Sequence, residues 1–182
     1  PYVAWAYSHN ALHHSWTNLK GRDPVYAPLT VAEFDRLSPL QKRRERFERS
    51  MAGVGLLYLR TIWWRFEIAP DNVHSRAMRR VGPYAADRAL VFLFLALHLA
   101  FAVYVANGRI GALAALVLLA ILLPFLVWNW LMGFVTYHHH THPSLQWFDD
   151  EKEWTFFRGQ ILGTAHVVPP ALIDLLLFRI MQ

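Results

Sequence analysis

Three histidines close to the start of the sequence, His9, His13 and His14, have the types and spacing of metal ligands. Imidazole is the commonest side-chain metal ligand, and its neutral form binds iron, zinc and copper. Successive residues of an α-helix advance by about 100°, so His9 and His13 share a face and His14 points about 100° further round. The pattern predicts that one ion binds the i, i+4 pair and that the third imidazole faces a second ion or another ligand. A surface helix with unrelated histidines, or a zinc site without catalysis, is the alternative.

A second histidine cluster lies far downstream, in the segment Tyr137-His138-His139-His140-Thr141-His142-Pro143. Only folding can bring it near the first cluster. The segment between the two clusters therefore decides whether they can form one site.

The composition indicates a membrane protein. Of 182 residues, 55% are hydrophobic, and they include 8 Trp, 12 Phe and 7 Tyr. The absence of cysteine excludes disulfides, thiolate ligands and a cysteine nucleophile. The sequence begins without methionine and stops within an apolar pattern, so we expect a piece of a longer protein, truncated at both ends.

Two uncharged stretches, residues 89–108 and 110–136, are long enough to cross a membrane. A helix needs about 20 residues to cross roughly 30 Å of hydrocarbon. The link Asn107-Gly108-Arg109 is a turn signal, so the two spans form a helical hairpin. Pro124 is expected to kink the second span.

The distribution of positive charge predicts the orientation of this hairpin. Between Thr17 and Arg88 lie 14 of the 18 Lys and Arg residues, whereas the tip of the hairpin has only Arg109. The positive-inside rule places the basic segment in the cytoplasm, which explains the net charge of +5 without nucleic acid. Because two spans return the chain to its starting side, both histidine clusters face the cytoplasm. We therefore expect a metal centre just beneath the membrane.

The other segments read as short helices outside the membrane. Residues 1–16 carry the first cluster, Thr30 to Glu33 fits a capping box, and residues 41–49 form a solvated charged helix. Tryptophans and arginines in residues 51–66 predict a helix that lies along the membrane surface. Residues 71–87 are polar, and the apolar run 171–178 is too short to span, so we expect an interfacial or buried helix there.

Taken together, the residues resemble a known family, the membrane fatty acid desaturases and their di-iron hydroxylase relatives, and most closely the omega-6/delta-12-like acyl-lipid branch. The segment His9-Asn10-Ala11-Leu12-His13-His14, followed by Thr17-Asn18, is similar to the middle of the family's three histidine boxes. Residues 136–143 and Trp154-Thr155-Phe156-Phe157-Arg158-Gly159 are similar to the segment after the fourth span. The likeness covers nearly the whole chain. It implies that the first box precedes Pro1 and that the last box follows Gln182.

This resemblance implies an all-α integral membrane protein in which residues 1–182 form a single partial desaturase domain. Residues 1–88 are expected to be cytoplasmic or interfacial, residues 89–136 form the hairpin, and residues 137–182 are again cytoplasmic or interfacial. The host membrane would be a bacterial inner membrane or an ER-type membrane. This piece alone is expected to be inactive.

The resemblance also implies the cofactors and the ligands. Two non-haem iron ions would use O2 as co-substrate and electrons from a ferredoxin or cytochrome b5-type donor to place a cis double bond in an acyl-lipid, acyl-CoA or acyl-ACP chain. The implied metal ligands are His9, His13, His14, His140 and His142, with no catalytic residue beyond them; for His140 and His142 a role in orienting other ligands is the alternative. We expect His138 and His139 to be surface residues, His74 to be solvated and His98 to bond a neighbouring helix. The acidic residues Asp149, Asp150, Glu151 and Glu153 could orient imidazoles or simply form a solvated loop.

Two other functions remain open from the sequence. A related di-iron hydroxylase or ketolase acting on alkanes, carotenoids or sterols would yield an oxygenated product instead of an alkene. A membrane metal-binding or transport protein without catalysis would need polar residues along its spans, where His98, Asn129 and a few small groups are all that the sequence offers.

Overall fold

The structure is a computed structural model that describes residues 3–25, 27–69, 84–176 and 179. Within these ranges the chain is helical and contains no strand, apart from one isolated bridge between Leu19 and Phe148. His74 and residues 71–83 of the segment that we expected to be polar lie outside the described residues. The all-α prediction is confirmed.

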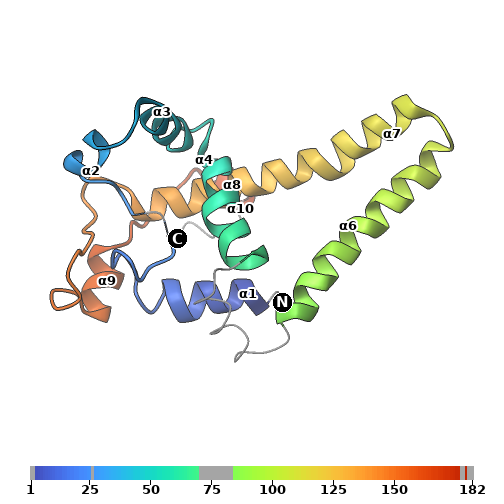
Figure 1. Cartoon of the computed structure of the whole chain (residues 1–182). Coiled ribbons are helices and arrows are strands. Elements are labelled where there is room, and N and C mark those ends of the chain that lie inside the picture. The colour runs from blue at the N-terminus through green and yellow to red at the C-terminus, as the bar shows by residue number, and fades with distance from the viewer. Residues whose placement is uncertain (1–2, 26, 70–83, 177–178, 180–182) are drawn as a thin grey trace.

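A long helical hairpin dominates the molecule (Figure 1). Its first arm is α6 (Tyr84–Ala106), and its second arm joins α7 (Ile110–Leu116), η3 (Val117–Leu122) and α8 (Leu123–His140) end to end. The arms have mean hydropathies of 2.5 and 2.9, and their apolar side chains are largely exposed. Such surfaces are stable in lipid, so the predicted membrane hairpin is confirmed. At its tip Asn107 and Gly108 adopt positive φ angles of 47° and 78°.

Both arms extend beyond the predicted limits. The first begins at Tyr84 and includes Asp87 and Arg88, and the second continues through the three adjacent histidines to His140. The charged residues at the start of α6 pack against the rest of the protein. The Asp87 carboxylate accepts the backbone N–H of Val3, and Arg88 donates to the carbonyl of Ile68 (3.1 Å). Helical continuity through His140 means that the second cluster is rigidly attached to the membrane span.

The second arm remains one helix through Pro124, because the turn before the proline is widened. In η3 the backbone bonds run from residue i to i+5, and the Leu123 N–H donates to the carbonyl of Leu118. Proline lacks an N–H and its ring crowds the carbonyl four residues earlier. A π-type turn is one way in which a helix accommodates such a local defect.

A second helix, formed by α4 (Val54–Tyr58) and η2 (Leu59–Ile68), crosses the long arm at α8 (Figure 1). The crossing is close because glycines occupy it. A Cβ built on Gly55 would lie 2.8 Å from Trp130 Cα, and one built on Gly133 would lie 2.4 Å from the carbonyl oxygen of Val54. The indole of Trp130 also donates to the carbonyl of Met51 (2.7 Å). That residues 51–66 lie along the membrane surface stays a prediction.

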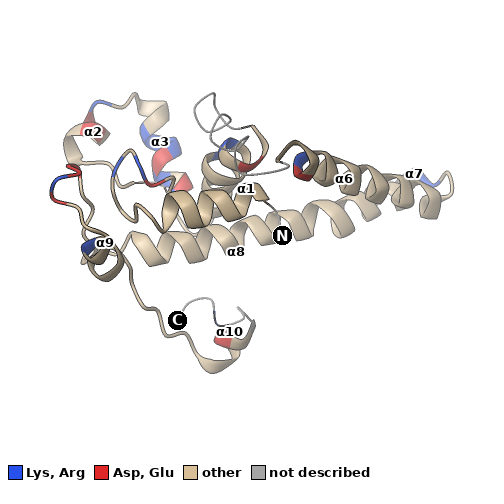
Figure 2. Ribbon diagram, turned by 90° about the horizontal axis from the view of Figure 1, so that it is seen from below, with Lys and Arg blue, Asp and Glu red and all other residues tan. Residues whose placement is uncertain are grey.

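The charged residues gather on the short helices at the end away from the hairpin tip (Figure 2). There α2 (Val31–Asp35) starts at the capping box of Thr30 and Glu33, which confirms the prediction, and α3 (Pro39–Glu48) starts at a second box made by Ser38 and Gln41. Hydrogen bonds from the Thr30 backbone and from Lys20 lower the pKa of Glu33 to about 2. The last two helices are α9 (Phe156–Leu162) and α10 (Ala171–Leu176).

We predict that the glycine crossing is a determinant of stability. Gly133→Ala should lower the free energy of unfolding by about 1–3 kcal/mol, because the new methyl group must displace backbone. Gly111→Ala is the matched control, since a Cβ there meets nothing within 4 Å and alanine favours the helix by about 0.5–1 kcal/mol. Thermal unfolding of the full-length protein in detergent measures both, and equal behaviour of the two variants would contradict the prediction.

Candidate metal centre

The first histidine cluster lies on a widened helical turn, which brings all three imidazoles to one side. After α1 (Val3–Ala6), the residues Tyr7–His13 form the π-helix η1, and the His14 N–H donates to the carbonyl of His9 (2.9 Å). An i→i+5 bond puts more than four residues in each turn, so residue i+5 lies much nearer to the side of residue i than it does in an α-helix. The ring centroids of His9 and His14 are 4.4 Å apart, closer than the 5.8 Å between His9 and His13. The expectation that His14 points away from the other two was therefore wrong.

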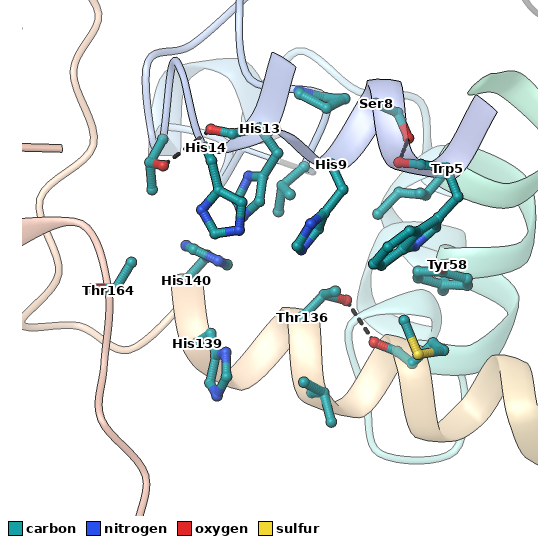
Figure 3. A pocket seen from close by; sticks show the side chains of 16 residues that line it. Trp5, Ser8, His9, His13, His14, Tyr58, Thr136, His139, His140 and Thr164 are labelled. Atoms are coloured by element: carbon teal, nitrogen blue, oxygen red, sulfur yellow. Dashed lines mark hydrogen bonds between the residues drawn. The ribbon is translucent and has the colours of Figure 1, made fainter. Parts of the chain in front are cut away.

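His140, the last residue of α8, points up to these three rings (Figure 3). Its ring centroid lies 4.7 Å from that of His13, with the planes nearly perpendicular at 88°. His139 projects from the other edge of the helix but also lines the same cavity. Folding thus joins the two clusters, and His139, which we expected at the surface, lies beside them.

The other histidines of the sequence analysis lie elsewhere. His142 is exposed, its Nδ1 stands 2.7 Å from Ser144 Oγ, and it is not among the residues that line the cavity. His138 packs on Phe134 and bonds that residue's carbonyl. His98 bonds the carbonyl of Phe94 (2.9 Å) in its own helix, and not a neighbouring helix as expected.

A buried carboxylate lies behind His13. His13 Nδ1 is 2.9 Å from Asp23 Oδ1, and the Asp23 side chain is fully shielded from solvent. The same carboxylate accepts the backbone N–H groups of Asn18 (2.7 Å) and Val25 (2.9 Å). Because a carboxylate with three such neighbours only accepts, the proton of His13 resides on Nδ1. The Nε2 lone pair is left for a metal ion, which is the usual second role of a carboxylate behind a ligating histidine.

The same arrangement recurs at His140 with neutral acceptors. Its Nδ1 lies 3.1 Å from Asn18 Oδ1 and 3.2 Å from the carbonyl oxygen of Gly163. A carbonyl cannot donate, so His140 too carries its proton on Nδ1 and keeps Nε2 as a lone pair. His13 and His140 are thus fixed as the tautomer that binds metal.

Sequence reasoning missed these orienting groups. The acidic run that could have supplied them is exposed, with Asp149 3.5 Å from Lys20 and Glu151 2.9 Å from Arg22. In the sequence Asp23 lies between Gly21 and Pro24, a pattern typical of a turn whose aspartate faces solvent. Its only sequence signal is its closeness to the histidine cluster.

The loop after the first cluster is held against the segment after the second. Leu19 and Phe148 form a parallel bridge, in which Lys20 N–H donates to Phe148 O and Phe148 N–H donates to Asn18 O, both at 2.9 Å. The Trp154 indole donates to the carbonyl of Thr17 (3.0 Å). These contacts join residues more than a hundred positions apart, and they set the spacing of the two clusters.

The cavity has a volume of about 330 Å³, with imidazoles at one end and an apolar wall at the other. The wall is formed mainly by Trp5, Val25, Tyr58, Ile62, Met132 and Val135. Burial lowers the pKa of His9 and that of His14 below the usual 6.5, and neighbouring imidazoles contribute to both shifts. These two rings are therefore neutral at neutral pH, which is the form that binds metal.

The imidazole nitrogens that line the cavity are of a chemical type that binds iron. Neutral imidazoles are good ligands for iron, zinc and copper, and the two orienting contacts supply the outer hydrogen bonds that such ligands need. Within the described ranges, no set of three or more His, Asp or Glu groups has the geometry to hold one ion directly. The clustered rings thus form a candidate centre whose ligand geometry is not complete in this chain's described residues.

Fold and site together define an all-helical membrane protein with a histidine-lined cavity at the end of a spanning helix. The sequence profile of the family described as "Fatty acid desaturase" matches residues 1–180. The chain belongs to the fatty acid desaturase family.

Individual relatives agree with this assignment. The chain is 27% identical over 97% of its length to the chloroplastic omega-6 fatty acid desaturase of Brassica napus, covering 37% of that protein. It is 28% identical over 88% of its length to the delta(12)-fatty-acid desaturase FAD2 of Vernicia fordii, covering 42% of it. An acyl-lipid (9+3)-(E)-desaturase of Dimorphotheca sinuata is 26% identical over 89% of the chain. The chain therefore spans about two fifths of the length of these relatives.

We predict that Asp23 is needed for metal affinity. Asp23→Asn replaces one carboxylate oxygen with an NH2 group that faces an N–H donor and removes the negative charge, so the hold on His13 is weakened. Metal affinity of the full-length protein should fall about 10–100-fold, as is typical when an outer partner of a ligand is lost. Asp149→Asn, which changes an exposed carboxylate, should have no effect. Metal content per protein after graded chelation measures both, and full retention by Asp23→Asn would refute the assignment.

Proposed function

We propose that the protein of which this chain is part is an acyl-lipid desaturase, an oxidoreductase of lipid metabolism. In the proposed reaction a –CH2–CH2– unit of an acyl chain becomes a cis –CH=CH– unit. One O2, two electrons and two protons are consumed together with the two removed hydrogens, and two waters are formed. Bound non-haem iron would supply the activation of O2. The electrons would come from a ferredoxin or cytochrome b5-type donor.

The observation that carries this proposal is the meeting of the two histidine clusters inside an apolar cavity. His13 and His140, from distant parts of the sequence, stand with ring centroids 4.7 Å apart, and both have Nδ1 hydrogen-bonded behind the ring. We assign His9, His13, His14 and His140 as metal ligands, and His142 stays a prediction whose ring lies outside the cavity lining. The remaining ligands would come from residues beyond this chain.

The apolar wall is suited to an acyl substrate. Tyr58 and Ile62 from the crossing helix face Met132 and Val135 of α8 across the cavity. These side chains offer contact with methylene groups and keep water from the imidazoles. Apart from the Tyr58 hydroxyl these side chains are apolar, which favours an acyl chain over a polar or charged solute at this wall.

The histidine end is proposed to face the cytoplasm of a bacterial inner membrane or an ER-type membrane. Basic residues gather on the helices at this end, whereas Arg109 is the one basic residue at the tip (Figure 2). A metal centre there is accessible to a soluble or membrane-bound electron donor and to lipids of the surrounding leaflet.

Single-cysteine labelling tests this sidedness. The chain has no cysteine, so Leu40→Cys on α3 and Ile110→Cys at the tip introduce unique thiols at exposed positions (78% and 84% exposed). In intact cells expressing a full-length protein free of other cysteines, an impermeant maleimide should label the Ile110→Cys variant alone. The Leu40→Cys variant should react only after the membrane is opened, and the reverse pattern would refute the orientation.

The activity itself is tested by expressing the full-length protein in a lipid-rich host. The fatty acid profile should gain a double bond, and His13→Ala should abolish the gain because a proposed ligand is lost. His98→Ala is the matched control, since its ring contacts Phe94 of its own helix on an exposed face. A hydroxylated or keto product would assign the protein to the hydroxylase or ketolase reading, and an unchanged profile would count against desaturation.

A further inference from the structure

Asn18 occupies an unusual position for its residue type. It is completely buried, and its φ angle of 58° lies in the left-handed region. Asparagine is one of the few residues other than glycine that adopts this conformation readily. The residue follows the first histidine cluster and forms part of the loop that pairs with Phe148.

The side chain of Asn18 joins three separate parts of the fold. Its Nδ2 donates to the carbonyl oxygens of Gly163 (2.7 Å) and Gln146 (3.1 Å), and its Oδ1 lies 3.1 Å from His140 Nδ1. Two carbonyl acceptors fix the orientation of the amide, because only the NH2 end can face them. The oxygen must therefore face His140, and it accepts the Nδ1 proton.

The backbone of Asn18 serves the other cluster. Its N–H donates to Asp23 Oδ2 (2.7 Å), and Asp23 Oδ1 in turn holds His13 Nδ1 (2.9 Å). Every polar group of Asn18 is thus hydrogen-bonded, including its carbonyl, which accepts from Phe148 N–H. One residue connects His13, through Asp23, with His140, through its own amide.

We propose that Asn18 is a positioning residue that sets the distance and orientation between the imidazoles of His13 and His140. Its backbone holds the first imidazole through Asp23, and its side chain holds the second directly. The inference rests on the proposed metal centre, since it concerns how two of the proposed ligands are aligned. It assigns no ligand or proton-transfer role to Asn18 itself.

Asn18→Gly separates the two functions of the residue. Glycine accepts the left-handed φ and keeps the backbone bond to Asp23, so the support of His13 is retained while the support of His140 is lost. In the full-length protein in detergent, Co²⁺ affinity, followed by the absorption of the bound ion, should fall about 10–100-fold. Asn107→Gly is the matched control, because it removes another asparagine with positive φ at the hairpin tip, far from the cavity. It should bind Co²⁺ as the parent protein does.

A double-mutant cycle distinguishes positioning from general stability. In a His140→Ala background Asn18→Gly should cause no further loss of Co²⁺ affinity, because the imidazole that it positions is already absent. In a His13→Ala background the loss caused by Asn18→Gly should persist. Equal losses in both backgrounds would show that Asn18 merely stabilises the fold and would overturn the proposal.

Asn18→Asp provides a second variant if the glycine variant does not fold. Aspartate keeps an acceptor for His140 Nδ1 but loses the donors to Gly163 and Gln146, so thermal stability should fall while Co²⁺ affinity stays above that of Asn18→Gly. If the Co²⁺ affinity of Asn18→Asp falls in proportion to its thermal stability instead, positioning through Oδ1 is contradicted.

If the parent protein binds Co²⁺ with a histidine-dependent spectrum and Asn18→Gly binds it equally well, only the role of Asn18 fails. If the parent protein shows no such binding, the metal centre fails as well.

Discussion

The candidate centre depends on where the Nδ1 protons of its buried imidazoles are hydrogen-bonded. A buried N–H without an acceptor is costly, and a ring free to turn would not present the same nitrogen to the cavity. Asp23 provides the acceptor for His13 Nδ1, and the Asn18 side chain together with the Gly163 carbonyl provides the acceptors for His140 Nδ1. All of these acceptors belong to loops, so the loops that follow each cluster determine whether the histidines can act together.

The membrane helices provide the rigid frame for those loops. The second arm reaches His140 without a break, and the crossing helix is pressed against it at Gly55 and Gly133. Because the crossing helix also contributes Tyr58 and Ile62 to the cavity, its packing shapes the apolar wall as well as the fold. The family assignment and the described geometry therefore agree: the end of a candidate span, the helix that crosses it and a histidine-bearing turn enclose one cavity.

The sequence was sufficient for features that depend on composition and local pattern. Uncharged stretches predicted the hairpin, and the Thr30–Glu33 pattern predicted a helix start, because both signals are contained in neighbouring residues. The direction of His14 was mispredicted, since a π-type turn replaces the α-helical one and depends on packing that no short pattern reveals. The orienting roles of Asp23 and Asn18 were missed, although Asn18 belongs to the quoted motif, because these roles arise from partners far along the chain or from an irregular turn.

The glycine contact at Gly133 and the imidazole of His140 are part of the same uninterrupted helix, α8. Each residue of an α-helix adds about 1.5 Å and 100° of rotation. The number of residues between them therefore fixes both the distance and the direction of His140 relative to the glycine contact. A single-residue insertion there would keep every ligand and every apolar side chain, yet would rotate His140 by about 100° and turn it out of the cavity. The length of this stretch is therefore as important to the proposed centre as the identity of the histidine that it carries.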